Sequence, residues 1–286
     1  MKSDEPVSRR WLYHGGSDAL IWRLSFTCNG LLVGQKRCPE TRRSLFFAIE
    51  EHSGRVVLDD YVLLLPDGTL PAGEGWFTGI ETVSGNLVYL HAYQENSPEH
   101  LGLWAVDPET GGVVWSLATV VYCGVLPDGL LVYIPSVFAG FPERRYLIID
   151  PLTGGELRRP EAGSPEINAL RERVVPEEWR QEIVLPEFAA LGSPLHAVLK
   201  GIGIAGPERC ECIAAGNLVA AADHVHDPMS GGWRSVIRIW RDGRLLYDDV
   251  MSEKRARPAL NSFLLHGRGL YYLKGESGLI AVDIRI

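Results

Sequence analysis

Two histidines at alternate positions are the clearest candidates for chemistry in this sequence. His224 and His226 lie in the segment DHVHD, and residues i and i+2 of a strand project from the same face. Imidazoles arranged in this way can share a metal ion. Cys210 and Cys212 also alternate and could add ligands. We favour the simpler interpretation, in which the histidines are solvated at a polar strand end and the cysteines are small buried core residues.

Acidic residues offer a second kind of chemistry, because paired carboxylates are the catalytic groups of most glycosidases. The candidates are Asp59-Asp60, Glu95, Glu99 and Asp248-Asp249. Both aspartate pairs follow corresponding outer strands of the repeat described below, which is typical of a solvated sheet edge. We favour that interpretation and assign no catalytic residue. The sequence contains no glycine-rich phosphate loop, nucleophile elbow or HExxH motif.

The elements that must position these residues are repeated along the chain. A glycine, any residue and two apolar residues open an extended run five times. The copies begin at Gly30, Gly85, Gly129, Gly216 and Gly269. A strand, a tight turn and another strand follow, most clearly as LWAVDPETGGVVW (103–115) and YLIIDPLTGGEL (146–157), and more weakly at 45–58 and 236–247. In such turns Pro fixes φ and Gly adopts positive φ, so the pattern predicts a series of four-stranded sheets.

The last repeat lacks one strand, and the beginning of the chain supplies a candidate for it. After 279–283 only three residues remain, whereas 20–24, which follows Gly15-Gly16, matches the missing strand. We predict that this N-terminal strand completes the last blade of a closed, all-β propeller that forms a single domain over 1–286. The third glycine interval, 216 − 129 = 87 residues, is long by about one blade. We therefore predict five blades with an irregular or helical insertion at about 156–205, and six blades as the alternative.

The unit LWAVDPETGGVVW resembles the repeat of quinoprotein-like propellers, in which an alternating strand ends in Asp, passes a Thr-Gly turn and enters a strand bearing Trp. More broadly it is WD40-like, and the chain resembles a bacterial family of propeller-like proteins of unknown function. The resemblance implies a fold and not a reaction. Quinone-dependent dehydrogenases of this type carry a neighbouring cysteine pair, whereas Glu211 separates Cys210 from Cys212 here. We therefore expect no cofactor.

In a propeller the loops between the second and third strands of each sheet share one rim, where binding residues normally gather. We predict that residues near these loops bind a ligand, namely Tyr93, His100, Arg144, His224, His226 and Trp233. The function we favour is a non-catalytic scaffold that binds a protein or small ligand on this rim. The alternatives are a glycosidase-like hydrolase in the axial depression and a metal-binding protein that uses His224 and His226.

Composition excludes some classes of function. The formal net charge is −8, and a nucleic-acid-binding protein needs a basic surface. The sequence contains no run of 18 apolar residues, the length that would predict a membrane span. The polar first ten residues do not resemble a secretory signal, and five scattered cysteines do not resemble a disulfide framework. We therefore expect a cytoplasmic protein and, because a closed ring leaves no sheet edge open for stacking, a monomer.

Overall fold

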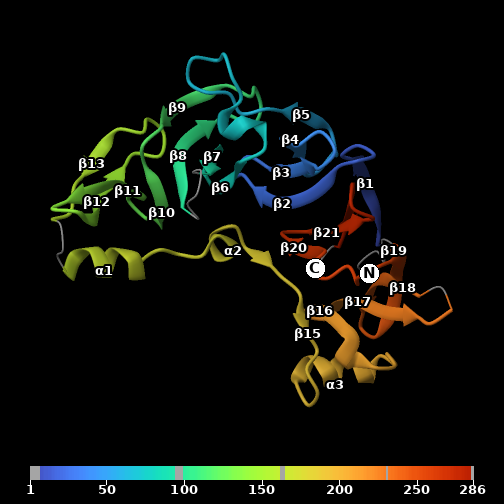
Figure 1. Cartoon of the computed structure of the whole chain (residues 1–286). Coiled ribbons are helices and arrows are strands. Elements are labelled where there is room, and N and C mark those ends of the chain that lie inside the picture. Colours follow the sequence, from blue (N-terminus) through green and yellow to red (C-terminus); the bar gives the residue numbers. More distant parts are fainter. Residues whose placement is uncertain (1–6, 94–98, 162–164, 230, 285–286) are drawn as a thin grey trace. The chain divides into compact units, whose positions relative to one another are not determined.

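The computed structural model of the chain describes residues 7–93, 99–161, 165–229 and 231–284 (Figure 1). Strands dominate these residues and form five antiparallel sheets, which confirms the predicted all-β class. No helix in this part of the chain is both long and apolar enough to cross a membrane. Contacts divide the chain into two compact units, Asp18–Gln181 and a second unit that combines Met1–Ser17 with Glu182–Ile286. The single domain over 1–286 stays a prediction.

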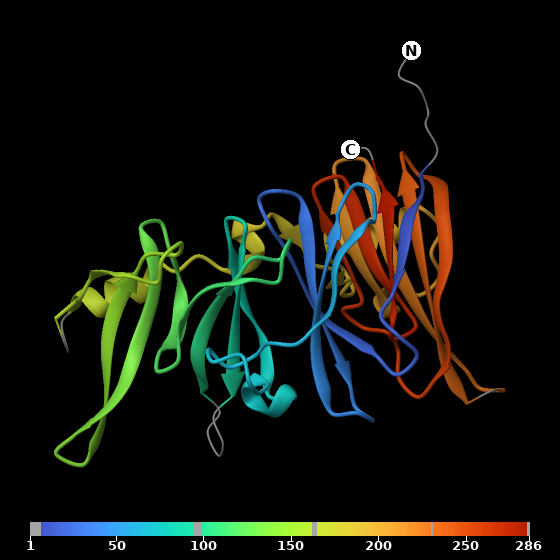
Figure 2. The same cartoon turned by 90° about the horizontal axis from the view of Figure 1, so that it is seen from above.

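The unit Asp18–Gln181 contains three sheets, which stand side by side in chain order in Figure 2. The first sheet consists of β2 (Leu20–Phe26), β3 (Leu31–Cys38), β4 (Arg43–Glu50) and β5 (Val56–Tyr61). The second consists of β6 (Thr78–Ser84), β7 (Leu87–Tyr93), β8 (His100–Val106) and β9 (Val113–Leu117). The third consists of β10 (Val121–Leu126), β11 (Gly129–Phe138), β12 (Phe141–Ile149) and β13 (Glu156–Arg158). Within each sheet the order in space follows the order in sequence.

Consecutive sheets of this unit pack face to face. The middle strands are continuous apolar runs because both of their faces are covered, as in 45–49 of β4, where every residue is buried. One core joins the first two sheets through Phe46 and Leu90, and another joins the second and third through Leu103 and Leu130. Three short helices accompany the sheets, η1 (Ala72–Gly75), α1 (Pro165–Glu172) and α2 (Glu177–Arg180).

The other unit contains two sheets of five strands. One has the order β1 (Ser8–His14), β22 (Gly278–Asp283), β21 (Gly269–Lys274), β20 (Phe263–His266) and β14 (Ile183–Val184). The other runs from β15 (Glu187–Phe188) through β16 (Cys210–Ala215), β17 (Leu218–Asp227) and β18 (Gly232–Arg241) to β19 (Arg244–Arg255). The helices α3 (Pro194–Gly201) and η2 (Pro207–Arg209) precede β16. Ile237 and Ile239 of β18 share a core with Tyr272 and Ile280, so these two sheets also pack together.

The glycine repeat marks an inner strand in every sheet. Its five copies lie at the beginning of β3, β7 and β11, the second strands of the four-stranded sheets, and of β17 and β21, the middle strands of the five-stranded sheets. The turn chemistry is also as predicted. In the turn after β8, Asp107 accepts hydrogen bonds from the Glu109 N–H and the Thr110 hydroxyl, each at 2.9 Å, and Gly111 has a φ of 73°.

An N-terminal strand completes the last sheet, but the strand differs from the predicted one. Residues 8–14 form β1 and pair antiparallel with β22, whereas 20–24 belong to β2 and begin a different sheet. The prediction that 20–24 completes the last sheet is therefore wrong. Trp11 and Tyr13 alternate with exposed neighbours, and Gly16 has a φ of 116° between the two strands. The glycines end one sheet and the next sheet begins after them.

The predicted irregular or helical insertion at about 156–205 contains α1, α2 and α3, which confirms its helical part. It also contains three short strands, β13, whose beginning the repeat at 146–157 predicts, and β14 and β15, which the sequence pattern does not predict. Each of them is the outermost strand of a different sheet, with β13 next to β12, β14 next to β20 and β15 next to β16. The insertion therefore contributes an edge strand to three of the five sheets.

Candidate functional site

The structure places the predicted binding residues at three hairpins between second and third strands. Tyr93 and His100 flank the β7–β8 connection, and Arg144 lies on β12 beside the β11–β12 hairpin. These three residues belong to the unit Asp18–Gln181. The other three, His224, His226 and Trp233, lie at the β17–β18 hairpin of the other unit.

The histidine pair on β17 does not form a shared metal site. His224 is buried, and its ring nitrogens contact the Ser235 hydroxyl at 2.9 Å and the Glu211 carboxylate at 3.2 Å. His226 is exposed and packs edge-on against Trp233, with 5.3 Å between ring centroids. Among the described residues neither histidine belongs to a group of three metal-ligating side chains. The interpretation of both histidines as solvated is wrong for His224, because Glu211 and Ser235 give its ring polar partners inside the sheet.

The two cysteines on β16 are buried core residues, as predicted. Burial raises the pKa of the Cys210 thiol to about 12 and that of the Cys212 thiol to about 11. Both side chains are therefore protonated at neutral pH. A thiolate is the form that attacks electrophiles, so neither cysteine is activated as a nucleophile.

Both aspartate pairs lie on outermost strands, β5 and β19, and Asp59, Asp60 and Asp248 are exposed, as expected of a solvated sheet edge. Asp59, Asp60 and Asp249 also have specific cationic partners. The ammonium of Lys36, whose side chain is only 2% exposed, lies 2.7 Å from carboxylate oxygens of both Asp59 and Asp60. Asp249 accepts hydrogen bonds from the Lys274 ammonium at 2.7 Å and from the Tyr272 hydroxyl. These carboxylates neutralise cations near strand edges. Of the other acidic candidates, Glu99 pairs with Arg144, and Glu95 lies outside the described residues.

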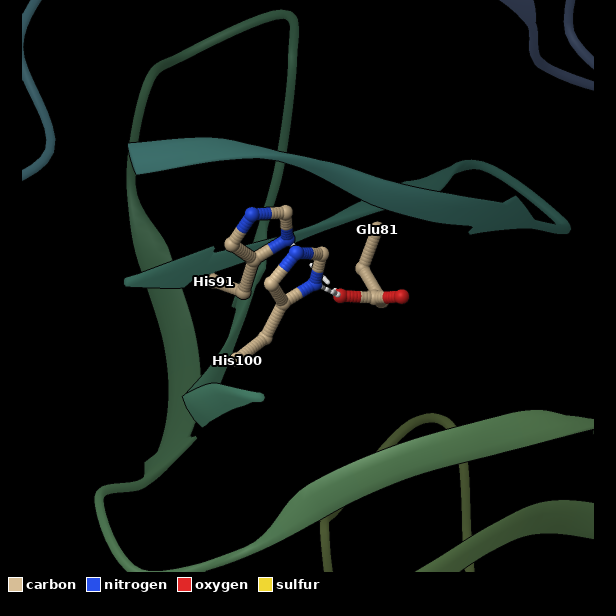
Figure 3. A group of neighbouring side chains, drawn as sticks. All are labelled: Glu81, His91 and His100. Atoms are coloured by element: carbon tan, nitrogen blue, oxygen red, sulfur yellow. Dashed lines mark hydrogen bonds and ion pairs between the residues drawn. The ribbon is translucent and has the colours of Figure 1, made fainter. Parts of the chain in front are cut away.

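A cluster that the sequence analysis did not assemble lies in the second sheet (Figure 3). Glu81 of β6, His91 of β7 and His100 of β8 bring their polar atoms together. One oxygen of Glu81 is 2.7 Å from Nδ1 of His91 and 2.7 Å from Nδ1 of His100. The two imidazoles are stacked, with 3.5 Å between centroids and 13° between planes. Tyr93 packs edge-on against both rings, at 5.0 Å from His91 and 4.6 Å from His100.

Two β-bulges explain how three strands aim side chains at one point. The register between β6 and β7 shifts between Ile80 and Thr82, so Glu81 is the extra residue of a bulge. The register between β7 and β8 shifts opposite His91, where Gly102 has a φ of 84°. A bulge bends its strand and redirects the bulged side chain. Strict strand alternation does not predict such a redirection.

Gly79 gives the His91 ring its space. The two residues are direct partners on neighbouring strands, and a Cβ at position 79 would lie 2.9 Å from Nε2 and Cε1 of the ring. The imidazole therefore covers the backbone of the neighbouring strand. Any larger residue at this position would displace it.

Charges within the cluster are strongly coupled. Burial alone would raise the pKa of the Glu81 carboxyl, but the contacts with His100 and His91 outweigh it and lower the pKa to about 2. Burial lowers the pKa of the His91 imidazole, against the opposing effect of Glu81. The Glu81 oxygen makes an ion-pair contact with His91 Nδ1, and neither nitrogen of this ring has a hydrogen-bond partner among the described residues.

A pocket of about 380 Å³ lies at the third sheet and α1. Its lining residues are Val121, Tyr122, Cys123, Tyr133, Arg144, Tyr146, Arg171 and Val174. The guanidinium of Arg144 lies 5.0 Å from the ring centroid of Tyr133 and is 2.7 Å from the Glu99 carboxylate. Arg171 comes from the last turn of α1. The pocket thus combines aromatic faces with two cations.

Burial keeps three titratable groups of the pocket neutral. It raises the pKa values of Tyr122, Tyr133 and the Cys123 thiol to about 12. Tyr122 and Tyr133 are therefore hydrogen-bonding phenols at neutral pH, and the thiol is not a nucleophile. None of the residues that line this pocket is acidic.

Of the residues in the cluster and the pocket or next to them, the sequence suggests His100, Tyr93 and Arg144 as candidates but not Glu81, His91 or the tyrosines of the pocket. One signal for His91 was available, because two histidines, at 91 and 100, flank the same predicted hairpin. No pattern in the sequence indicated Glu81, because its direction depends on a bulge.

A family model described as "Domain of unknown function (DUF4905)" matches residues 27–115, a segment that contains Glu81, His91 and His100. This match covers 115 − 27 + 1 = 89 of the 286 residues. No curated protein matches the chain.

Several solved structures are similar to the chain at low sequence identity. Acylaminoacyl peptidase from Pyrococcus horikoshii is 12% identical with a TM-score of 0.29, and the match covers 90% of this chain and 36% of the peptidase. The β-propeller domain of the trilobed protease from Pyrococcus furiosus is 10% identical with a TM-score of 0.29, covering 94% and 71%. The Cps50 (Swd1) β-propeller domain from Myceliophteria thermophila is 8% identical with a TM-score of 0.35, covering 98% and 100%. The chain spans less than two fifths of the length of the first peptidase, and none of these similarities carries an inference about activity.

Proposed function

We propose that this protein is a non-catalytic propeller scaffold that binds a small organic anion in the pocket between the third sheet and α1. The observation that carries the proposal is the lining of that pocket, where two arginines and three tyrosines surround about 380 Å³. Arginine binds carboxylates and phosphates with charge-assisted, often bidentate hydrogen bonds. Tyrosine supplies an apolar ring and a hydroxyl for the rest of the ligand. Pockets of this size accommodate a metabolite-sized molecule.

The location of the pocket agrees with the predicted binding rim. Arg144, one of its lining residues, is also a predicted ligand-binding residue beside a hairpin between second and third strands. Its ion pair with Glu99 connects this hairpin with the β7–β8 connection, beside Tyr93 and His100. The remaining predicted binding residues, His224, His226 and Trp233, stay candidates for a separate contact at the β17–β18 hairpin.

The scaffold in this proposal is a closed ring of five blades. Support comes from five sheets in series, from face-to-face packing of consecutive sheets within each unit, and from β1 pairing with β22. A monomer in the cytoplasm is the state and location that we propose, because a ring protects its strand edges and because five unpaired cysteines are typical of a reducing compartment.

Ligand binding is better supported than hydrolysis. A glycosidase needs two carboxyl groups about 5 to 10 Å apart on either side of its substrate. The pocket has no acidic lining residue, and Glu81 is already engaged by two histidines. For the same reason the proposal assigns no catalytic residue.

Isothermal titration calorimetry with phenyl phosphate tests the proposal, with phenol as the uncharged control ligand. We expect phenyl phosphate to bind the wild-type protein and Arg171→Gln to weaken binding about tenfold, which corresponds to about 1.4 kcal/mol. Arg173→Gln is the matched control, because Arg173 is also exposed near the end of α1 but does not line the pocket. Absence of binding to the wild-type protein, or an equal loss in both variants, would contradict a specific anion pocket.

A further inference from the structure

We propose that Glu81, His91 and His100 form a binding site for a divalent transition-metal ion, with Zn²⁺ as the ion best suited to it. The site is independent of the anion pocket, since the two share no residue. Two imidazoles and one carboxylate are a donor set that zinc accepts with a water molecule in the fourth position. Imidazole also suits Cu²⁺, Ni²⁺ and Fe²⁺, whereas Mg²⁺ and Ca²⁺ prefer an all-oxygen environment.

The donor atoms already converge. One potential ligand atom from each residue lies within 4.8 Å of the others. Ligand atoms of a tetrahedral zinc site are about 3.3 Å apart, because zinc–nitrogen and zinc–oxygen bonds are about 2.0 to 2.2 Å long. The Glu81 oxygen is 2.7 Å from each Nδ1, so small rotations of the carboxylate and rings would admit an ion (Figure 3).

The burial of His91 is a further sign of a ligand, because its Nε2 has no polar partner among the described residues and its Nδ1 has only the ion-pair contact with Glu81. The residue is only 3% exposed, and both of its ring nitrogens are buried without a hydrogen-bond partner in the described part of the chain. An unpaired buried polar group is unfavourable, because it has lost its hydrogen bonds to water. A metal ion bound at Nδ1 would satisfy one of these atoms and would also give a reason for stacking two imidazoles against each other.

Access and positioning also favour a metal site. The side chain of His100 is 33% exposed, so an ion can reach the cluster from solvent, while His91 and Glu81 form its buried side. The Tyr93 ring packs edge-on against both imidazoles and restricts their orientation. The nearby Arg23 does not compete for the site, because its guanidinium donates to the backbone carbonyls of residues 80 and 81 and pairs with Glu177.

Metal content and metal affinity test this inference. Protein purified without a histidine tag is stripped with a chelator and titrated with Zn²⁺ and, separately, with Co²⁺, whose visible d–d absorption reports tetrahedral coordination by nitrogen and oxygen. We expect one ion per chain and a loss of affinity of at least about 100-fold in His100→Ala. His226→Ala is the matched control, because His226 is an exposed histidine outside the cluster. The His226→Ala variant should bind Zn²⁺ and Co²⁺ with the affinity of the wild-type protein.

A second variant leaves all three ligands in place. Gly79→Ala would displace the His91 ring, because the new Cβ would meet it at 2.9 Å, and we expect weaker Co²⁺ binding with an altered absorption spectrum. Gly201→Ala is the control for the added methyl group, because a Cβ at position 201 would meet no surrounding atom within 4 Å. The inference is wrong if the wild-type protein binds neither ion at micromolar concentration, or if His226→Ala lowers affinity as much as His100→Ala. Phenyl phosphate binding is measured on the same samples, so failure of the anion pocket and failure of the metal site are distinguished.

Discussion

At the scale of single residues, this chain pairs its partly buried charges with partners from neighbouring strands. Lys36 on β3 reaches Asp59 and Asp60 at the edge strand β5. Asp249 on β19 accepts hydrogen bonds from Lys274 and Tyr272 of β21, which belongs to the neighbouring sheet of the same unit. In both cases the acidic group neutralises a cation and joins two elements, so the pairs contribute to stability where an isolated buried charge would reduce it.

The Asp249 contacts predict a pH-dependent contribution to stability. Burial raises the pKa of this carboxyl, but Lys274 and Tyr272 outweigh burial and lower the pKa below its ordinary value. A carboxyl whose folded-state pKa is lowered stabilises the fold above its unfolded pKa, and this contribution is lost as the pH falls through the folded pKa. We expect Asp249→Asn to reduce the free energy of unfolding by about 1 kcal/mol at neutral pH, since partial exposure weakens the interaction.

Urea unfolding of both proteins at neutral pH and near pH 3 measures this effect. The difference between wild type and variant should shrink at the lower pH, which lies below the ordinary pKa of an aspartate, about 3.9. Asp248→Asn is the control, because Asp248 is the exposed neighbour. A difference of the same size at both pH values would show that the effect does not come from the Asp249 charge.

At the scale of elements, the one-turn helix α2 connects the first strands of two sheets. Glu177 accepts hydrogen bonds from the Val83 N–H at 3.2 Å and from the Gln181 amide at 2.7 Å, and it pairs with Arg23 of β2. Arg180 donates to the Val83 carbonyl at 2.9 Å and to the Thr82 hydroxyl at 2.7 Å. Because Glu81 precedes these residues on β6, α2 also restricts the strand that carries the proposed metal ligand.

Glu177→Gln is predicted to destabilise the unit Asp18–Gln181 by about 2 kcal/mol, because the variant loses a charged acceptor that has several partners. Thermal or urea unfolding followed by circular dichroism measures the change. Glu178→Gln provides the matched control, since Glu178 is exposed in the same helix and should change the free energy of unfolding by less than about 0.5 kcal/mol. Equal effects of the two substitutions would mean that α2 is not a structural connection.

The elements were more predictable from the sequence than the site. Every glycine repeat lies at the beginning of an inner strand, because the turn before that strand needs positive φ or close approach each time. The Glu81 cluster depends instead on two bulges, which shift the register by one residue and leave no periodic signal. The strand that completes the last sheet was misidentified for a related reason. Both 8–14 and 20–24 have alternating patterns next to Gly15-Gly16, and only pairing with β22 distinguishes them.

At the scale of the whole molecule, the proposed ring depends on the position of β1. This strand pairs with β22 near the other end of the chain, and only residues 15–19 separate it from β2 of the first sheet. It covers the edge of β22, whose residues 279–282 are completely buried. An uncovered strand of this kind is a template for aggregation. The N-terminal strand is therefore the element on which the proposed ring depends most.

Small-angle scattering and deletion of residues 1–14 test this dependence together. A compact chain of 286 residues is expected to have a radius of gyration of about 19 Å, and the closed ring predicts a value close to it. Deletion removes β1 and leaves β22 with a free edge, so we expect the shortened protein to expand or aggregate. A synthetic peptide of residues 7–17, added in excess, should restore the compact monomer by pairing with β22, whereas a scrambled peptide of the same composition should not. A shortened protein as compact and soluble as the full chain would mean that β1 does not hold the ring closed.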